Sequence, residues 1–155
     1  MNQLTLIDDI PSLLRSKSRC LKRMLDAGEK FLIISDALLT QAENKENPLA
    51  VYDAEREGIM NALSLYDRKL TEMIQALNSD QRVGTWIENA RSEMLLNEAL
   101  VLAVLDMDDL VMKKITQAQT QISQQLAENR KSRETVAKFK STWVSDGGEE
   151  VDTTL

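Results

Sequence analysis

Apolar side chains recur every three to four residues along most of this chain, which is the spacing of amphipathic helices. The longest such stretch, residues 80–142, keeps one heptad register without a slip and without a Pro. With position a at Ile87, the a positions are Ile87, Met94, Val101, Asp108, Ile115, Ile122, Asn129 and Val136, and the d positions are Val83, Ala90, Asn97, Val104, Val111, Ala118, Gln125, Ser132 and Phe139. At about 1.5 Å per residue, the pattern predicts one helix of roughly 95 Å.

Two shorter helices are predicted ahead of it, over residues 11–43 and 48–78. Pro11 suits the first turn of a helix, where its missing N–H costs nothing. The polar segment 44–48 ends in Pro and predicts a turn, and Ser79 or Asp80 is expected to cap the long helix. Because short turns join helices that run side by side, neighbouring helices should be antiparallel.

These elements predict an all-α fold, an elongated antiparallel three-helix bundle or coiled coil with a long C-terminal helix. Residues 1–144 form one helical domain in this interpretation, because 155 residues suffice for a single core. Residues 145–155 contain two adjacent Gly and four acidic groups and predict a disordered acidic tail. Strand signals are nearly absent, since no segment alternates apolar and polar residues for long.

The three predicted helices differ in length, and this mismatch carries the functional expectation. The first two span about 45 Å each and can cover roughly half of the third. Residues 94–112 are apolar nearly all round and should be the best-buried section, whereas the stripe thins beyond them. The apolar residues expected to bind a partner there are Ile115, Ile122, Leu126, Val136, Phe139 and Trp143. The alternative is that they form the ordinary core of a homodimer or of an intramolecular bundle.

Charge is unevenly distributed over the chain, whose net charge is −6. Residues 31–112 carry six basic and fifteen acidic groups, whereas residues 113–142 carry seven basic and two acidic groups. Arg130, Lys131 and Arg133 are therefore expected to steer an acidic partner toward the end of the long helix. The overall acidity argues against nucleic acid as the main partner.

Groups that commonly perform catalysis are missing. The chain has no His and no glycine-rich phosphate loop, so no catalytic, metal or cofactor site is predicted and an enzyme is not expected. Asp106, Asp108 and Asp109 resemble the start of a calcium loop, but they lie mid-helix and indicate a solvated acidic patch. Asp108 is unusual at a seam position and is expected to mark where the long helix becomes exposed. Cys20 is the only cysteine. A lone Cys in a helix favours a packing role over redox chemistry. Because one Cys cannot form an intramolecular disulfide, we also expect a cytoplasmic protein.

Membrane contact is not favoured by the sequence. The most apolar run, residues 94–112, contains four acidic residues and an Asn, and the N-terminal residues lack the apolar core of a signal peptide. A basic cluster in the first helix is either a solvated face or a surface for acidic partners or lipid headgroups. It comprises Arg15, Lys17, Arg19, Lys22 and Arg23.

The layout of two helices of about 30 residues, a third twice as long and a loose tail resembles the FlgN/FliT type of flagellar export chaperone. Two stretches are similar to the family. One combines Leu38-Leu39 with residues 51–60. The other joins segment 104–109, which contains three Asp, to Ile115, Ile122 and Leu126 and then to segment 130–133, which contains three basic residues. Phe139 falls where many members carry a Tyr, although the Gly that usually follows closely is absent.

The resemblance implies a cytoplasmic, non-enzymatic chaperone or adaptor. Such a protein holds the helical terminus of a hook-associated or filament-cap subunit before export, by pairing of helices. Two alternatives stay open at this point: a structural coiled-coil homodimer without a client, in which Asn97, Gln125 and Asn129 set the register, and a membrane-surface module.

Overall fold

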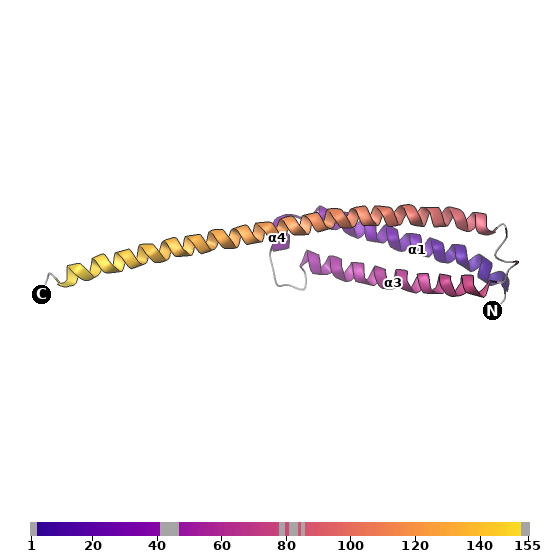
Figure 1. The fold of residues 1–155 in the computed structure, drawn as a ribbon, viewed down its shortest axis with the longest axis horizontal. Coiled ribbons are helices and arrows are strands. Elements are labelled where there is room, and N and C mark those ends of the chain that lie inside the picture. The colour runs from indigo at the N-terminus through magenta and orange to yellow at the C-terminus, as the bar shows by residue number, and fades with distance from the viewer. Residues whose placement is uncertain (1–2, 41–46, 78–79, 81–83, 85, 153–155) are drawn as a thin grey trace. The chain divides into compact units, whose positions relative to one another are not determined.

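The computed structural model describes residues 3–40, 47–77, 80, 84 and 86–152, and all four elements in this part of the chain are helices (Figure 1). They are α1 (Gln3–Leu32), α2 (Asp36–Thr40), α3 (Pro48–Ala76) and α4 (Trp86–Asp152). The predicted all-α class is therefore confirmed. The chain divides into two compact units, Met1–Lys114 and Ile115–Leu155. Helix α4 continues through the boundary.

Helix α1 differs from the predicted helix over residues 11–43 at both ends. It begins at Gln3, so Pro11 lies inside the helix rather than in its first turn. The upstream turns form because Ile10 is buried in the core beside Leu14, which offsets the backbone bond that Pro11 cannot donate. The helix ends at Leu32, and the separate short helix α2 starts at Asp36.

Helix α3 begins with a polar cap and a proline. The Asn47 side chain accepts a hydrogen bond of 2.9 Å from the backbone N–H of Leu49, and Pro48 occupies the first turn. The helix ends at Ala76 because Leu77 is extended, with φ −69° and ψ 133°. Of the turn predicted over residues 44–48, residues 44–46 lie outside the described residues, as does the predicted cap Ser79.

Helix α4 covers 67 residues and differs from the predicted range 80–142 at both ends. It begins at Trp86 instead of Asp80, after a turn in which the Gly84 carbonyl accepts from the N–H of Ile87 at 3.1 Å. It continues to Asp152, into the segment predicted to be a disordered tail. No Pro follows to interrupt it, and each added residue extends an existing ladder of hydrogen bonds at little cost.

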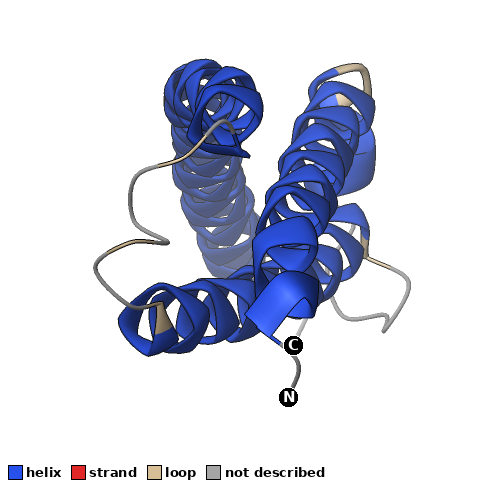
Figure 2. Ribbon diagram, turned by 90° about the vertical axis from the view of Figure 1, so that its right-hand side faces the viewer, coloured by secondary structure: helices blue, strands red, loops and turns tan. Residues whose placement is uncertain are grey.

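The core of the first unit lies along the contact of α1 with α3 and includes residues of α4. Figure 2 shows the described helices end-on, with no strand among them. One buried cluster contains Ile10, Leu14, Leu70, Leu77 and Ala90, and the other contains Cys20, Leu21, Met24, Ile59, Leu63 and Val104. Cys20 is thus a packed core residue. At one end of the α1–α3 contact, the rings of Phe31 and Tyr52 stack with centroids 4.8 Å apart.

Residues 94–112, predicted to be the best-buried section, contain three of the five buried residues of α4 among those whose burial is described, but most of their apolar side chains are exposed. In this part of α4 the buried residues are Asn97, Val104 and Val111, whereas Leu95 and Leu102 are 59% and 64% exposed. A single helix that packs on one side buries only residues of one stripe, and the apolar residues on its other faces stay in contact with solvent. The first unit therefore carries an exposed apolar surface that the pattern alone did not indicate.

Candidate partner-binding surface

The residues predicted to bind a partner lie on α4 within the second unit, Ile115–Leu155. Ile115 and Ile122 are partly exposed. The more distal apolar residues are much more accessible: Leu126, Phe139 and Trp143 are 64%, 67% and 74% exposed. Large apolar side chains with this accessibility typically mark a binding surface when they are contiguous.

The spacing of these residues gathers them on one side of the helix. The stripe that advances by four and three residues in turn is Ile122, Leu126, Asn129, Arg133, Val136, Lys140 and Trp143. Phe139 lies beside it, three residues after Val136 and four before Trp143. The stripe is therefore a mixed surface of four apolar side chains, one Asn and two basic groups.

The basic residues named in the prediction are all exposed on the same segment. Arg130, Lys131 and Arg133 lie in solvent, and residues 115–143 as a whole carry five basic and two acidic groups. Because all three residues belong to one α-helix, Arg130 and Arg133 lie about one turn apart, whereas Lys131 lies on another side of the helix. The arrangement suits an amphipathic helix with acidic residues beside its apolar stripe.

Three polar contacts in the first unit were not predicted, and each involves a residue of α4. The first concerns Asp108, which accepts a two-pronged ion pair from Arg56 of α3, with oxygen–nitrogen distances of 2.7 and 2.9 Å. The expectation that Asp108 belongs to a solvated patch is thus wrong for this residue, while Asp106 and Asp109 are exposed. The only sequence signal was an acid at a seam position, which does not identify its partner 52 residues away.

The second contact explains the buried polar residue of the heptad. Asn97 is 6% exposed, and its amide donates to the backbone carbonyls of Leu14 and Glu93 at 3.2 and 3.0 Å. The Ser18 hydroxyl donates to the Asn97 side-chain oxygen at 3.4 Å. Asn97 therefore fixes the register of α4 against α1 in the same chain, and its bonds are already made without a second copy.

The third contact closes the end of α1. The Lys114 ammonium donates to the carbonyls of Leu32 and Ile34 at 3.0 and 2.5 Å and lies 3.4 Å from the Asp36 carboxylate. A cation is favourable at the C-terminus of one helix, and an acid is favourable in the first turn of the next. Lys114 thus joins α4 to the break between α1 and α2.

The basic cluster of α1 is only partly available to a partner. Lys17 forms an ion pair of 2.5 Å with Asp67 of α3. The other four cationic residues, Arg15, Arg19, Lys22 and Arg23, are exposed. One member of the cluster thus forms an ion pair between helices, and the exposure of the others agrees with either interpretation of the cluster.

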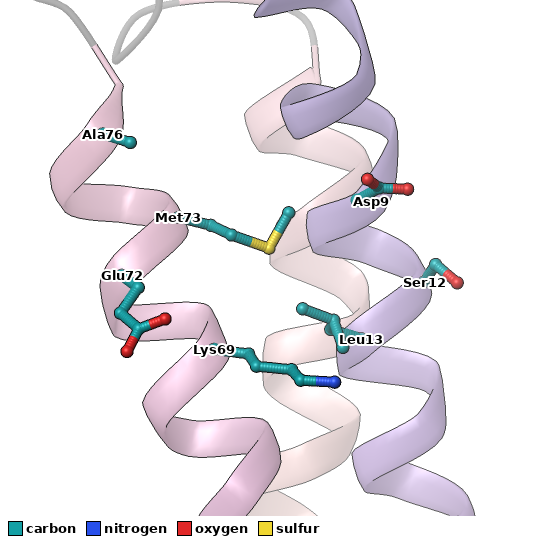
Figure 3. A pocket seen from close by; sticks show the side chains of 7 residues that line it. All are labelled: Asp9, Ser12, Leu13, Lys69, Glu72, Met73 and Ala76. Carbon is teal, nitrogen blue, oxygen red and sulfur yellow. The ribbon is translucent and has the colours of Figure 1, made fainter. Parts of the chain in front are cut away.

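A cavity of about 500 Å³ lies between α1 and α3, near the start of α1 and the end of α3 (Figure 3). Met73 points from α3 toward α1 across this cavity (Figure 3). The lining residues are Asp9, Ser12, Leu13, Lys69, Glu72, Met73 and Ala76. The lining is a mixture of charged helix-surface groups around an apolar floor, without the convergent polar groups that orient a small ligand.

The described residues contain neither a metal-binding cluster nor a helix that could cross a membrane. No group of three or more His, Cys, Asp or Glu side chains there is arranged to hold a metal ion. None of the described helices combines the length and the apolar character needed to cross a membrane.

Comparisons of the chain with models of protein families, with curated proteins and with solved structures found no match.

Proposed function

We propose that this chain is a non-enzymatic, cytoplasmic export chaperone or adaptor of the FlgN/FliT type. Its client is the helical terminus of a secreted hook-associated or filament-cap subunit, held by pairing of helices. Neither nucleic acid nor a membrane is part of the proposal. The observation that carries it is the exposed apolar and basic stripe of α4 around Leu126, Val136 and Phe139.

The proposal assigns separate tasks to the two units. The first unit is proposed to be a three-helix bundle in which α1, α3 and the first part of α4 alternate in direction. Supporting contacts are Lys17–Asp67 and Phe31–Tyr52 between α1 and α3, in which the residue number rises in one helix and falls in the other. This unit anchors α4, and the second unit presents the client-binding stripe.

The client's chemistry follows from the stripe. Apolar residues of the client would cover Leu126, Val136 and Phe139, which are exposed in the free chain. Removing this apolar surface from water would stabilise the complex by about 25 cal/mol per Å². Acidic groups of the client would face Arg130 and Arg133, raising the association rate and selecting the register of the two helices. A client helix without acidic residues should bind more slowly, and its binding should depend less on salt.

The test is binding of a fluorescent peptide that carries the terminal helix of the filament-cap subunit from the same genome. The variant Leu126→Asp with Phe139→Asp should weaken binding at least tenfold, because two charges replace buried apolar contacts. The matched control is Gln124→Asp with Ser141→Asp, two exposed polar positions of the same helix, which should bind as the unchanged chain does. Equal binding by both variants would refute the proposal.

A further inference from the structure

The side of the first unit on which α1 and α4 lie next to each other carries a surface that the proposed client-binding stripe does not include. The Asn97 amide of α4 donates to the backbone carbonyl of Leu14 in α1, and Met107 of α4 lies against Gly28 of α1. Residue numbers rise together in these two contacts, so the two helices run in the same direction here. Their outer rows of side chains therefore lie level with each other along several turns.

The outer row of α1 is basic. Arg15 and Lys22 lie three residues before and four residues after Ser18, whose hydroxyl donates to Asn97 of α4. Both are exposed, so they border the line along which α1 contacts α4. Arg19 is exposed between them, and we define the basic row by Arg15, Arg19 and Lys22. None of these three cations forms an ion pair with another described residue.

The adjoining row of α4 is apolar. Met107 faces α1, and Leu100, seven residues before it, lies on the same side of the helix. Three or four residues from these two positions, and away from the buried d positions, lie the residues that we define as the apolar row: Leu96, Ala103 and Leu110. Leu96 and Leu110 are 40% and 49% exposed, and Ala103 is partly exposed. An apolar row thus runs beside a basic row.

Acidic groups occur toward the two ends of this surface. Residues 10–25 of α1 contain no acid, and Asp26 is the first that follows them. In α4, Glu93 precedes the apolar row and Asp106 lies toward its far end. Glu98 belongs to another side of α4, where it lines a cavity beside α3. The part of the surface that is only basic and apolar is therefore about three turns long.

We infer that the basic row and the apolar row together bind an amphipathic helix of another protein, whose apolar stripe has acidic residues along one edge. A helix is about 10 Å wide, which is close to the separation of two packed helices, so it can contact both rows at once. Its apolar side chains would cover Leu96 and Leu110. Its carboxylates, three or four residues apart, would meet the basic row.

The distribution of charge favours an acidic helix over an anionic membrane. A membrane is a broad surface and would also meet Glu93, Asp106 and Asp26, whereas a helix can lie between these groups. The rest of the first unit is acidic as well, because residues 31–112 carry fifteen acidic and six basic groups. An apolar row alone would accept a helix of any charge, and the basic row selects an acidic one.

The test is binding of fluorescent peptides to the full chain. One peptide is a synthetic amphipathic helix with Leu at every third or fourth position and Glu along one edge of this stripe, and the second has Lys in place of each Glu. Because the proposed client site is also apolar and basic, every chain carries Leu126→Asp with Phe139→Asp, which removes that site. This background chain should bind the Glu peptide on the order of tenfold or more tightly than the Lys peptide, and salt should reduce the preference.

Reversal of the basic row is the decisive variant. Arg15→Glu with Lys22→Glu should invert the preference, because the charges that face the edge of the peptide have changed sign. The matched control Arg68→Glu with Lys69→Glu changes the net charge equally at exposed positions of α3 and should keep the original preference. Circular dichroism establishes that every variant keeps its helices.

The apolar row is tested with uncharged substitutions. Leu96→Gln with Leu110→Gln should weaken binding of the Glu peptide on the order of tenfold, because polar groups replace the side chains that the peptide covers. The control Leu102→Gln with Leu105→Gln changes two leucines that are exposed on another side of α4, and it should bind as the background chain does.

Four outcomes would overturn the inference. Equal binding of the two peptides excludes an acidic partner, and a preference that survives reversal of the basic row locates the contact elsewhere. Sedimentation with phosphatidylglycerol vesicles that only the reversed variant loses assigns the basic row to a lipid surface. A dimer that only this variant loses assigns it to a second copy of the chain. Because the background chain lacks the proposed client site, these results are independent of whether the proposed client binds.

Discussion

The ammonium group of Lys114 donates a hydrogen bond of 3.0 Å to the backbone carbonyl of Leu32, 82 positions earlier in the chain. It meets the end of α1, where the last carbonyls of a helix lack partners of their own. The same nitrogen also donates to Ile34 and lies near Asp36. One side chain of α4 therefore completes the hydrogen bonding at the break between α1 and α2.

Replacing Lys114 by Met should destabilise the protein by about 1–3 kcal/mol, because the carbonyls of Leu32 and Ile34 lose a charged donor in a half-buried position. Met keeps most of the aliphatic stem, so the change isolates the ammonium group. The free energy of unfolding from urea titrations measures the effect. Lys113→Met, at the exposed neighbouring position, is the control and should change stability by less than about 0.5 kcal/mol.

The ion pair of Arg56 with Asp108 should contribute a coupling energy of about 1 kcal/mol, since its two-pronged geometry is favourable but both side chains stay partly exposed. A double-mutant cycle with Arg56→Met and Asp108→Asn measures this coupling from unfolding free energies. Additive effects of the two single changes would show that the pair contributes nothing beyond its separate residues. The coupling should also decrease in 1 M salt.

Two helical glycines should respond in opposite ways to replacement by Ala. Gly58 of α3 has open space around the position of a Cβ atom, so Gly58→Ala should stabilise the protein by about 0.5–1 kcal/mol through helix propensity. At Gly28 of α1 a Cβ would lie 2.9 Å from the sulfur of Met107, so Gly28→Ala should destabilise by about 1 kcal/mol.

Thermal unfolding of both glycine variants provides the measurement, with the unchanged chain beside them. The physical cause can be tested separately, because in a Met107→Ala background the obstructing side chain is gone. There, Gly28→Ala should become neutral or stabilising. A loss of stability that persists in this background would show that Met107 is not the obstacle.

Stability should fall above about pH 10 because of Tyr52. Burial raises the pKa of the Tyr52 phenol above its ordinary value, Asp108 and Asp53 raise it further, and Arg56 opposes them. The unfolded chain then loses the phenolic proton at lower pH than the folded protein does. The stabilising difference is fully present below the unfolded pKa and is lost as pH rises through the folded pKa.

Urea unfolding between pH 9 and pH 11.5 measures this dependence. In Tyr52→Phe the part of the decline in stability that is due to this phenol should disappear. The effect of losing the hydroxyl group near Arg56 is measured separately, by the difference in unfolding free energy at pH 9. Tyr66→Phe retains Tyr52 and should keep the decline. A decline of equal slope in Tyr52→Phe would assign the alkaline sensitivity to other groups.

The periodicity of the sequence determined the helical elements, because the three-to-four spacing of apolar residues is a property of the chain itself. It also identified one real seam: the d positions Ala90, Asn97, Val104 and Val111 are all buried. The exposure of Leu126, Phe139 and Trp143 agrees with the expectation of an uncovered stripe. Local signals were weaker at the ends, where Ile10 extends α1 upstream of Pro11.

Only the tertiary structure decided which of the two predicted seams of α4 is covered. The a positions Ile87, Met94 and Val101 are exposed, although they are as apolar as the d positions that are buried. A heptad pattern indicates two adjacent apolar stripes that can be buried. Each stripe is buried only where a neighbouring helix covers it, and α1 and α3 cover the stripe of d positions. The partners of Asn97, Asp108 and Lys114 likewise lie 52 to 83 positions away, at distances that no local pattern encodes.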